Sequence, residues 1–172
     1  MSQPTLYLMF GFPGAGKTTT AKIIEELTGA VRLSSDEVRV GLFPEPLFSD
    51  EEHIALYAEL NKRTEELLQS GKSVIYDANL NRYEHRAEKY TICHQTGAKA
   101  QLIWLHTERE LAKSRAVQDS RSHLWPRSEQ PETMFDRIAD VVELPTESEH
   151  PIELDGTKID SAYVADKLSI TA

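Results

Sequence analysis

The segment Gly11–Thr18 reads Gly-Phe-Pro-Gly-Ala-Gly-Lys-Thr and fits the phosphate-loop pattern G-x-x-x-x-G-K-[ST]. An apolar, strand-like run precedes it and a helical pattern follows, which disfavours the alternative of a chance match in a glycine-rich turn. Glycines permit positive φ and bring backbone amides close to an anion. Lys17 would add a positive charge at the β- and γ-phosphates of ATP, and the Thr18 hydroxyl would bind Mg²⁺. The residues expected to bind the nucleotide are Gly11, Pro13, Gly14, Ala15, Gly16, Lys17, Thr18 and Thr19.

Asp36 stands where a second strand-like run ends and a helix is expected to begin. A carboxylate there can accept a hydroxyl proton, or orient the hydroxyl for attack on a γ-phosphate. Arg39, about one helical turn further, can hold the acceptor or a phosphate. Alternatively, Asp36 only stabilises the helix, because an acidic residue in the first turn interacts favourably with the helix dipole. Because Ser34 can already cap that helix, we favour the catalytic interpretation.

Asp77 follows the apolar run at 73–76, which resembles a Walker B segment. We expect Asp77 to bind Mg²⁺ together with Thr18, through water. Two alternatives remain open, since Asp77 could contact the acceptor or cap the turn into residues 78–82.

Arginines recur in the polar segment at 109–128, where a solvated helix face and a functional segment are the competing interpretations. Guanidinium groups suit phosphates and stack on adenine. Taken as a group, these arginines indicate a lid that closes over ATP. The residues are Arg109, Arg115, Arg121 and Arg127.

The composition fits one domain, 1–172, with 40% hydrophobic and 27% charged residues. No run of about 18 apolar residues is present, so no membrane span is expected. The N-terminus has no basic segment ahead of its first apolar run, which argues against a signal peptide. Cys93 is the single cysteine, which favours a reducing, cytoplasmic setting. A net charge of −9 repels polyanions, so contact with long nucleic acid would need a local basic patch.

Strand-like and helical patterns alternate along the chain, which predicts an α/β fold with a parallel sheet covered on both faces. Ligands of such sheets bind beyond the carboxyl ends of the strands. The expected strands are 5–10, 31–33, 73–76, 101–105 and 152–154. The expected helices begin near 17, near 36, before Ile54, at 83, after 107 and at 131, with a last one at the C-terminus.

Three stretches together resemble the small P-loop kinases related to polynucleotide kinase, chloramphenicol phosphotransferase, gluconate kinase and zeta toxin. The stretches are GFPGAGKTTTA at 11–21, LSSDEVR at 33–39 and GKSVIYDANLNRYEHR at 71–86. The resemblance implies a P-loop three-layer sandwich with strand order 2-3-1-4-5. It also implies Asp36 as the acceptor-activating carboxylate, Arg39 on the acceptor side, and Arg115 and Arg121 as lid arginines. Asp119 stands where the family often has the second lid arginine, and Arg86 is a further substrate-binding candidate.

The sequence therefore predicts a kinase that transfers the γ-phosphate of ATP to a hydroxyl, with Lys17, Asp36, Arg115 and Arg121 as catalytic residues. The acceptor is expected to be a small molecule, since 28 acidic residues oppose 19 basic ones. Two alternatives are a polynucleotide 5′-hydroxyl kinase and an ATPase or nucleotide switch that works through a protein partner.

Overall fold

The computed structural model describes residues 2–119 and 125–171. The strands are β1 (Thr5–Phe10), β2 (Val31–Ser34), β3 (Val74–Asp77), β4 (Lys99–His106) and β5 (Ile152–Asp155). The helices are α1 (Lys17–Thr28), α2 (Ser35–Leu42), α3 (Asp50–Gln69), α4 (Tyr83–Thr96), α5 (Arg109–Gln118), α6 (Pro131–Ala139) and α7 (Ser161–Lys167), with a short 3-10 helix, η2 (Glu147–Glu149). Within these described residues, none of the helices has the length and apolar character that crossing a bilayer requires.

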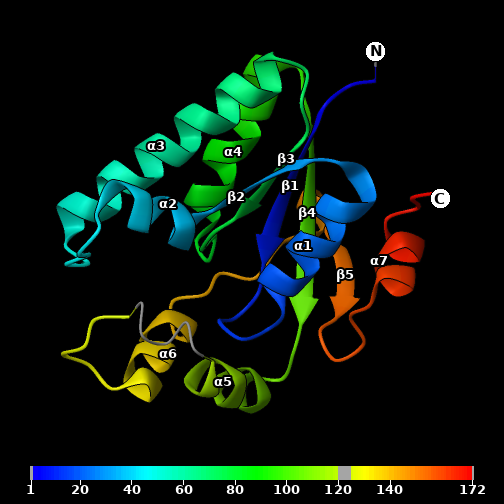
Figure 1. Cartoon of the computed structure of the whole chain (residues 1–172). Coiled ribbons are helices and arrows are strands. Elements are labelled where there is room, and N and C mark those ends of the chain that lie inside the picture. The colour runs from blue at the N-terminus through cyan, green and yellow to red at the C-terminus, as the bar shows by residue number, and fades with distance from the viewer. Residues whose placement is uncertain (1, 120–124, 172) are drawn as a thin grey trace.

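The strands form one parallel sheet in the order β2-β3-β1-β4-β5, which confirms the predicted α/β fold and its strand order. All five strands therefore end at the same edge, where Figure 1 shows α5 and α6 beside the arrowheads. The register pairs Ser34 of β2 with Asp77 of β3. The two strands that lead into the predicted acceptor and Mg²⁺ residues thus end side by side.

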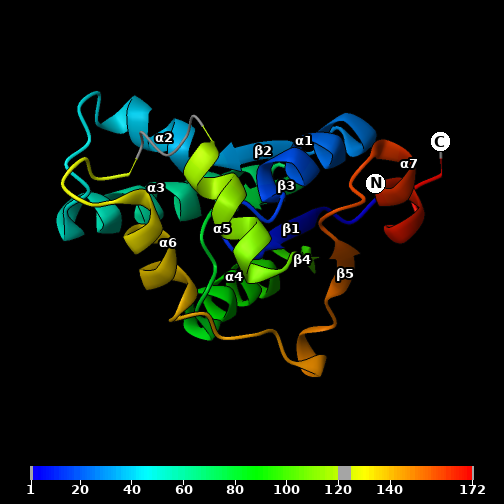
Figure 2. The same cartoon turned by 90° about the horizontal axis from the view of Figure 1, so that it is seen from below.

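Helices cover both faces of the sheet and enclose two apolar cores. Helices α3 and α4 lie on one face, and α1 and α7 lie on the other (Figure 2). Because successive strand residues point to opposite faces, Leu8 enters the core beneath α3 and α4, and Met9 enters the core beneath α1 and α7. Tyr76 and Ile75 alternate in the same way. This rigid sandwich fixes the positions of the strand ends.

A smaller apolar cluster joins α5 to α6 at the strand ends. Its buried members are Ala112, Ala116, Phe135 and Ala139, with Phe12 and Trp125 packed against them. Lys113 of α5 also pairs with Asp136 of α6 at 2.7 Å. The segment predicted as a lid, 109–128, therefore begins as a helix packed on α6, and residues 120–124 of it lie outside the described part of the chain.

Two large apolar residues, Ile54 of α3 and Trp104 of β4, are not fully buried. Ile54 of α3 is 70% exposed. The buried stripe runs instead through Glu52, Leu56 and Leu60, because the Glu52 carboxylate turns inward to accept backbone amide hydrogens. Trp104 is half-buried, packs against the core beneath α3 and α4, and stacks on His106 with 4.1 Å between the ring centroids.

Candidate active site

The phosphate loop adopts the backbone that its glycines allow. Gly14 and Gly16 have φ values of 78° and 107°, in the left-handed region that favours glycine. Gly16 directly precedes α1 and offers no side-chain cap, so the first-turn amides of that helix are suited to an anion. The Lys17 ammonium donates to the carbonyl oxygens of Gly11 and Phe12 at 2.6 and 3.0 Å. These bonds hold the ammonium within the loop.

Helix α5 packs directly on the loop at Gly14. A Cβ atom at Gly14 would overlap the carbonyl oxygen of Ala112 and lie 2.8 Å from the amide nitrogen of Ala116. Neither atom belongs to a flexible side chain, so only a residue without a side chain permits this approach. The position of α5 is thereby coupled to the shape of the phosphate loop.

The turn after β5 supports the loop from another side. The amide of Gly156 donates to the carbonyl oxygen of His106 at 2.7 Å. Thr107 donates through its hydroxyl to the carbonyl oxygen of Ala15 at 2.9 Å. A Cβ atom at Gly156 would overlap the Thr107 hydroxyl, so glycine is required here by close approach. Arg115 of α5, predicted as a lid arginine, donates to the Gly156 carbonyl oxygen at 3.2 Å and so lies beside the loop.

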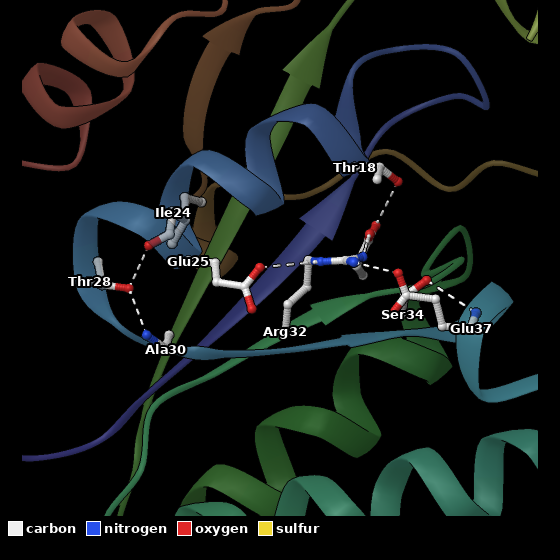
Figure 3. A network of polar contacts seen from close by, with 9 residues as sticks. Thr18, Ile24, Glu25, Thr28, Ala30, Arg32, Ser34 and Glu37 are labelled. Atoms are coloured by element: carbon white, nitrogen blue, oxygen red, sulfur yellow. Dashed lines mark hydrogen bonds and ion pairs between the residues drawn. The ribbon is translucent and has the colours of Figure 1, made fainter. Parts of the chain in front are cut away.

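Asp77 contacts both Thr18 and Arg32, an arginine of β2, and Figure 3 shows Arg32 between Glu25 and Glu37. The Thr18 hydroxyl donates to one oxygen of Asp77 at 3.4 Å, and Arg32 donates to the other at 3.1 Å. Arg32 also binds Glu37 at 2.6 Å and lies 3.6 Å from Glu25. Burial alone would lower the pKa of Arg32, but its bonds to Glu37 and Asp77 outweigh burial and raise the pKa above its ordinary value.

The sequence carried a signal for Arg32 in the alternation of β2. Val31 and Leu33 belong to the core beneath α3 and α4, so the residue between them must face α1. A cation on a largely covered sheet face requires an anionic partner. What the sequence did not indicate was that this partner would be Asp77, which is 45 residues away.

Asp36 and Asp77 line one cavity together with the phosphate loop, as their positions at strand ends predicted. The cavity holds about 200 Å³. Ser34 accepts the Glu37 amide at 3.4 Å and so caps α2, as expected, which leaves Asp36 in the first turn at the cavity. The described lining is Pro13, Gly14, Gly16, Lys17, Thr18, Ser34, Ser35, Asp36, Asp77, Ala78, Asn79, Asn81, Ala116, Asp119, Trp125 and Ile138.

Arg39, expected on the acceptor side, is not part of this lining. Its guanidinium donates to Glu52 at 3.5 Å and lies 4.9 Å from the centre of the Phe48 ring. Glu52 also accepts the amides of Leu47 and Phe48 at 2.8 and 2.9 Å. The contacts of Arg39 therefore organise the chain between α2 and α3.

Arg86, the further substrate-binding candidate, is fully buried and does not belong to the described lining of this cavity. It binds both carboxylate oxygens of Glu149, at 2.7 and 3.2 Å, and donates to the carbonyl oxygen of Leu80 at 2.9 Å. A buried guanidinium requires such pairing. Burial would raise the pKa of Glu149, but hydrogen bonds from Arg86, the Thr146 amide and Tyr90 hold it below its usual value.

Arg109 and Arg121 are two further arginines of the segment predicted as a lid. Arg109 pairs with Asp136 and Asp140 of α6, at 3.1 and 2.8 Å, and so links α5 to α6. Arg121, predicted to be catalytic, lies outside the described residues. Asp119 and Trp125, on either side of that gap, both line the cavity.

A parallel sheet of order 2-3-1-4-5, whose first strand leads through a glycine-rich loop into a helix, defines a P-loop nucleotide-binding domain with a kinase-like fold. The model of the AAA_33 family, described as an AAA domain, matches residues 6–145, and the chain belongs to that family.

Curated relatives match only part of the chain. An uncharacterised protein of Mycobacterium tuberculosis is 35% identical over 94 residues, which cover 48% of this chain and 19% of that protein. Adenylate kinase 9 of Mus musculus is 38% identical over 74 residues, which cover 43% of this chain and 3% of that protein. The chain thus corresponds to a minor part of each relative.

Solved structures share the fold over nearly the whole chain. The APS kinase of Mycobacterium tuberculosis, in complex with AMPPNP and APS, has a TM-score of 0.74 at 18% identity, covering 99% of this chain and 98% of that one. A gluconokinase from Sinorhizobium meliloti has a TM-score of 0.68 at 16% identity, covering 98% and 92%. A chain of the Pnkp1/Rnl/Hen1 RNA repair complex has a TM-score of 0.66 at 20% identity, covering 82% and 45%.

Proposed function

We propose that the protein is a kinase that transfers the γ-phosphate of ATP to a hydroxyl group of a small-molecule acceptor. The observation that carries this proposal is the shared cavity, which is lined by both the phosphate loop and Asp36. A nucleotide site and a candidate general base therefore face one space. The kinase-like fold of the solved relatives supports the same class of reaction.

The nucleotide would bind through the amides of the loop and the Lys17 ammonium. Thr18 and Asp77 present hard oxygen donors 3.4 Å apart, which suit Mg²⁺, and they are the residues that would hold it. A bound Mg²⁺ would neutralise charge on the β- and γ-phosphates. Arg32 keeps Asp77 oriented by occupying its other oxygen. Arg115, beside the loop, is the described lid arginine that we assign to the transferred charge.

Asp36 would prepare the acceptor. Its carboxylate accepts the hydroxyl proton as the acceptor oxygen forms a bond to the γ-phosphorus. The bond from that phosphorus to the β–γ bridging oxygen breaks, so the products are a phosphomonoester and ADP. Positioning and charge stabilisation supply most of the rate in such transfers, which is why one carboxylate can suffice. A cytoplasmic location, where ATP and Mg²⁺ are present, stays a prediction of the sequence.

A screen of hydroxyl compounds for acceptor-dependent release of ADP tests the proposal. Sugars, nucleosides, aminoglycosides and 5′-hydroxyl oligonucleotides form its arms. ADP release that rises with one small compound and saturates supports the proposal. Efficient labelling of oligonucleotides that weakens steeply with salt would favour the 5′-hydroxyl kinase instead. Hydrolysis stimulated only by a protein would favour the nucleotide switch.

A further inference from the structure

Arg32 of β2 contacts carboxylates from three other elements. Its side chain is only 9% exposed, and its guanidinium donates to Asp77 at the end of β3 at 3.1 Å. Figure 3 shows it between Glu37 of α2, to which it donates at 2.6 Å, and Glu25 of α1, which lies 3.6 Å away. Residues of β3, α2 and α1 all line the cavity. One covered cation therefore connects three of the elements that form the candidate active site.

The first turn of α2 is held more firmly by Arg32 than by its own cap. Ser34 accepts the amide of Glu37 at 3.4 Å, which is longer than the usual range of about 2.7–3.2 Å. The Glu37 carboxylate, in contrast, accepts from Arg32 at 2.6 Å, and charge-assisted bonds of this kind are the stronger ones. Asp36 directly precedes Glu37 in the same turn. The contact with Arg32 therefore holds the turn that carries Asp36.

The guanidinium of Arg32 acts as a rigid spacer between two carboxylates. A guanidinium is planar and presents its donors in a fixed fork. One terminal nitrogen of Arg32 binds Asp77 and the other binds Glu37, so a rigid group sets the separation of these two carboxylates. The second oxygen of Asp77 accepts from Thr18 at 3.4 Å. Arg32 thereby sets the position of α2 relative to the two residues that would hold Mg²⁺.

The backbone of the sheet does not set this separation by itself. Ser34 of β2 pairs with Asp77 of β3, but α2 begins at the next residue and leaves the sheet. Phosphoryl transfer requires the base, the acceptor oxygen and the γ-phosphorus to be aligned, and a misplacement of about 1 Å can lower the rate about 100-fold. A side-chain contact between the turn that carries Asp36 and the end of β3 can supply that alignment.

We propose that Arg32 is a positioning residue, which holds the first turn of α2, and Asp36 with it, in a fixed place relative to Asp77. This inference rests on the proposed kinase function and adds a residue to it. Arg32 is not part of the described lining of the cavity, so it acts through the carboxylates that it binds. The competing interpretation is that Arg32 only neutralises the charge of Asp77, in which case its bond to Glu37 has no effect on the reaction.

Glu37→Ala separates these two roles, because it removes the link to α2 and leaves the Arg32–Asp77 pair in place. Glu25→Ala is the matched control, since it removes another exposed carboxylate that faces the same guanidinium. With the acceptor found in the screen, we expect kcat to fall about tenfold in Glu37→Ala and to stay near the wild-type value in Glu25→Ala. KM for ATP should change by less than about twofold in both variants. Equal kcat values in the two variants would overturn the proposal.

The conservative variant Glu37→Gln distinguishes a lost contact from a lost charge. Glutamine keeps a side-chain oxygen that can accept from Arg32, but it carries no charge. We expect Glu37→Gln to recover most of the kcat that Glu37→Ala loses. A kcat as low as that of Glu37→Ala would assign the effect to the charge of Glu37 and would contradict positioning through Arg32.

Hydrogen exchange measures the hold on α2 without any reaction. The amides of residues 39–42 bond to the carbonyl oxygens of the first turn, so they lose protection when that turn loosens. We expect these amides to exchange about fivefold or more faster in Glu37→Ala than in Glu25→Ala. Affinity for a fluorescent ATP analogue with Mg²⁺ should be the same in both variants, because Asp77 keeps its arginine. Equal exchange rates would show that Arg32 does not hold this turn and would overturn the proposal.

Failure of this inference can be told from failure of the proposed function. If the wild-type protein transfers phosphate to an acceptor and Glu37→Ala does so equally well, the kinase function stands and the positioning role is wrong. If the wild-type protein transfers phosphate to no acceptor, the proposed function fails and the positioning role fails with it. In that case the exchange of residues 39–42 still decides whether Arg32 holds α2 as a structural contact.

Discussion

Asp77 illustrates how single residues from separate segments build one site. Its carboxylate ends β3, and its two oxygens contact Thr18 from the start of α1 and Arg32 from β2. The pairing leaves Asp77 only 6% exposed without leaving its charge uncompensated. A buried carboxylate with both oxygens engaged keeps one orientation, which a metal-binding role requires.

Replacement of Arg32 by Met tests this arrangement. The change leaves the Asp77 charge buried without its cationic partner, and such losses cost about 3–5 kcal/mol of folding stability. Urea unfolding at pH 7 measures the loss, and Arg32→Lys is expected to recover part of it. Arg63→Met is the matched control, because Arg63 pairs with Glu59 on the exposed surface of α3. Equal losses for Arg32→Met and Arg63→Met would contradict the structural importance of the Arg32–Asp77 pair.

Replacement of Asp36 by Asn separates catalysis from nucleotide binding. The amide preserves the shape of the carboxylate but cannot take up the acceptor proton, so transfer should fall by about 10²- to 10⁴-fold. Affinity for a fluorescent ATP analogue should change little. Asp50→Asn is the control, because Asp50 is also an acid in the first turn of a helix, but it lies outside the cavity. The same effect in both variants would favour the helix-dipole interpretation of Asp36.

At the scale of elements, α5 is coupled to the phosphate loop through Gly14. The helix can approach this closely only because no Cβ intervenes. The cluster that α5 forms with α6 then extends this contact to Phe135, whose ring lies 6.1 Å from that of Phe12 in the loop. A movement of α5 and α6 as one unit would therefore change the shape of the phosphate loop.

Gly14→Ala is expected to disturb both stability and nucleotide binding. Its matched control is Gly97→Ala, since Gly97 has a similar φ, 70° against 78°, but open space around its Cβ position. The control carries the backbone strain alone, roughly 1–2 kcal/mol, whereas Gly14→Ala must also displace α5. Thermal unfolding and titration with an ATP analogue measure the two effects. A Gly14→Ala protein that binds nucleotide as tightly as Gly97→Ala would refute the coupling.

At the scale of the whole molecule, Arg86 and Glu149 join distant parts of the chain. They are 63 residues apart and connect α4 to the segment that leads from α6 to β5. Tyr90 strengthens the same link by donating to Glu149 at 2.8 Å. This ion pair fixes the path by which the chain returns from α6 to the sheet.

Stability should fall in acid because of this pair. The pKa of Glu149 is lowered in the folded protein, so its contribution is complete above the ordinary carboxyl pKa of about 4.3 and is lost as pH falls toward the folded value. Glu149→Gln should cost on the order of 3 kcal/mol at pH 7 and should flatten the acid dependence of unfolding. Urea unfolding from pH 7 to pH 3, with exposed Glu132→Gln as control, checks both. An unchanged acid slope in Glu149→Gln would contradict the assignment.

The sequence predicted the strand order of the sheet and the positions of Lys17, Asp36 and Asp77 at its edge, because both depend on local patterns. Strand ends, helix caps and the loop motif are enough to place Lys17, Asp36 and Asp77 at one edge of the sheet. The partners of the arginines were not predictable in this way. Arg39 pairs with Glu52, which is 13 residues further along the chain, and Arg86 pairs with Glu149, which is 63 residues further. Such pairs arise from tertiary packing, which produces no regular residue spacing that could be recognised in the sequence.

Measuring which product receives the γ-phosphate of ATP tests the central claim most directly. Wild-type protein and Lys17→Ala are incubated with γ-labelled ATP, Mg²⁺ and the best compound from the acceptor screen, and the products are separated. Folding of the variant is checked by its thermal unfolding. We predict that the label enters a phosphomonoester of the acceptor in stoichiometry with ADP, and that a folded Lys17→Ala protein loses this transfer. Label found only in inorganic phosphate, or transfer undiminished in Lys17→Ala, would contradict the account.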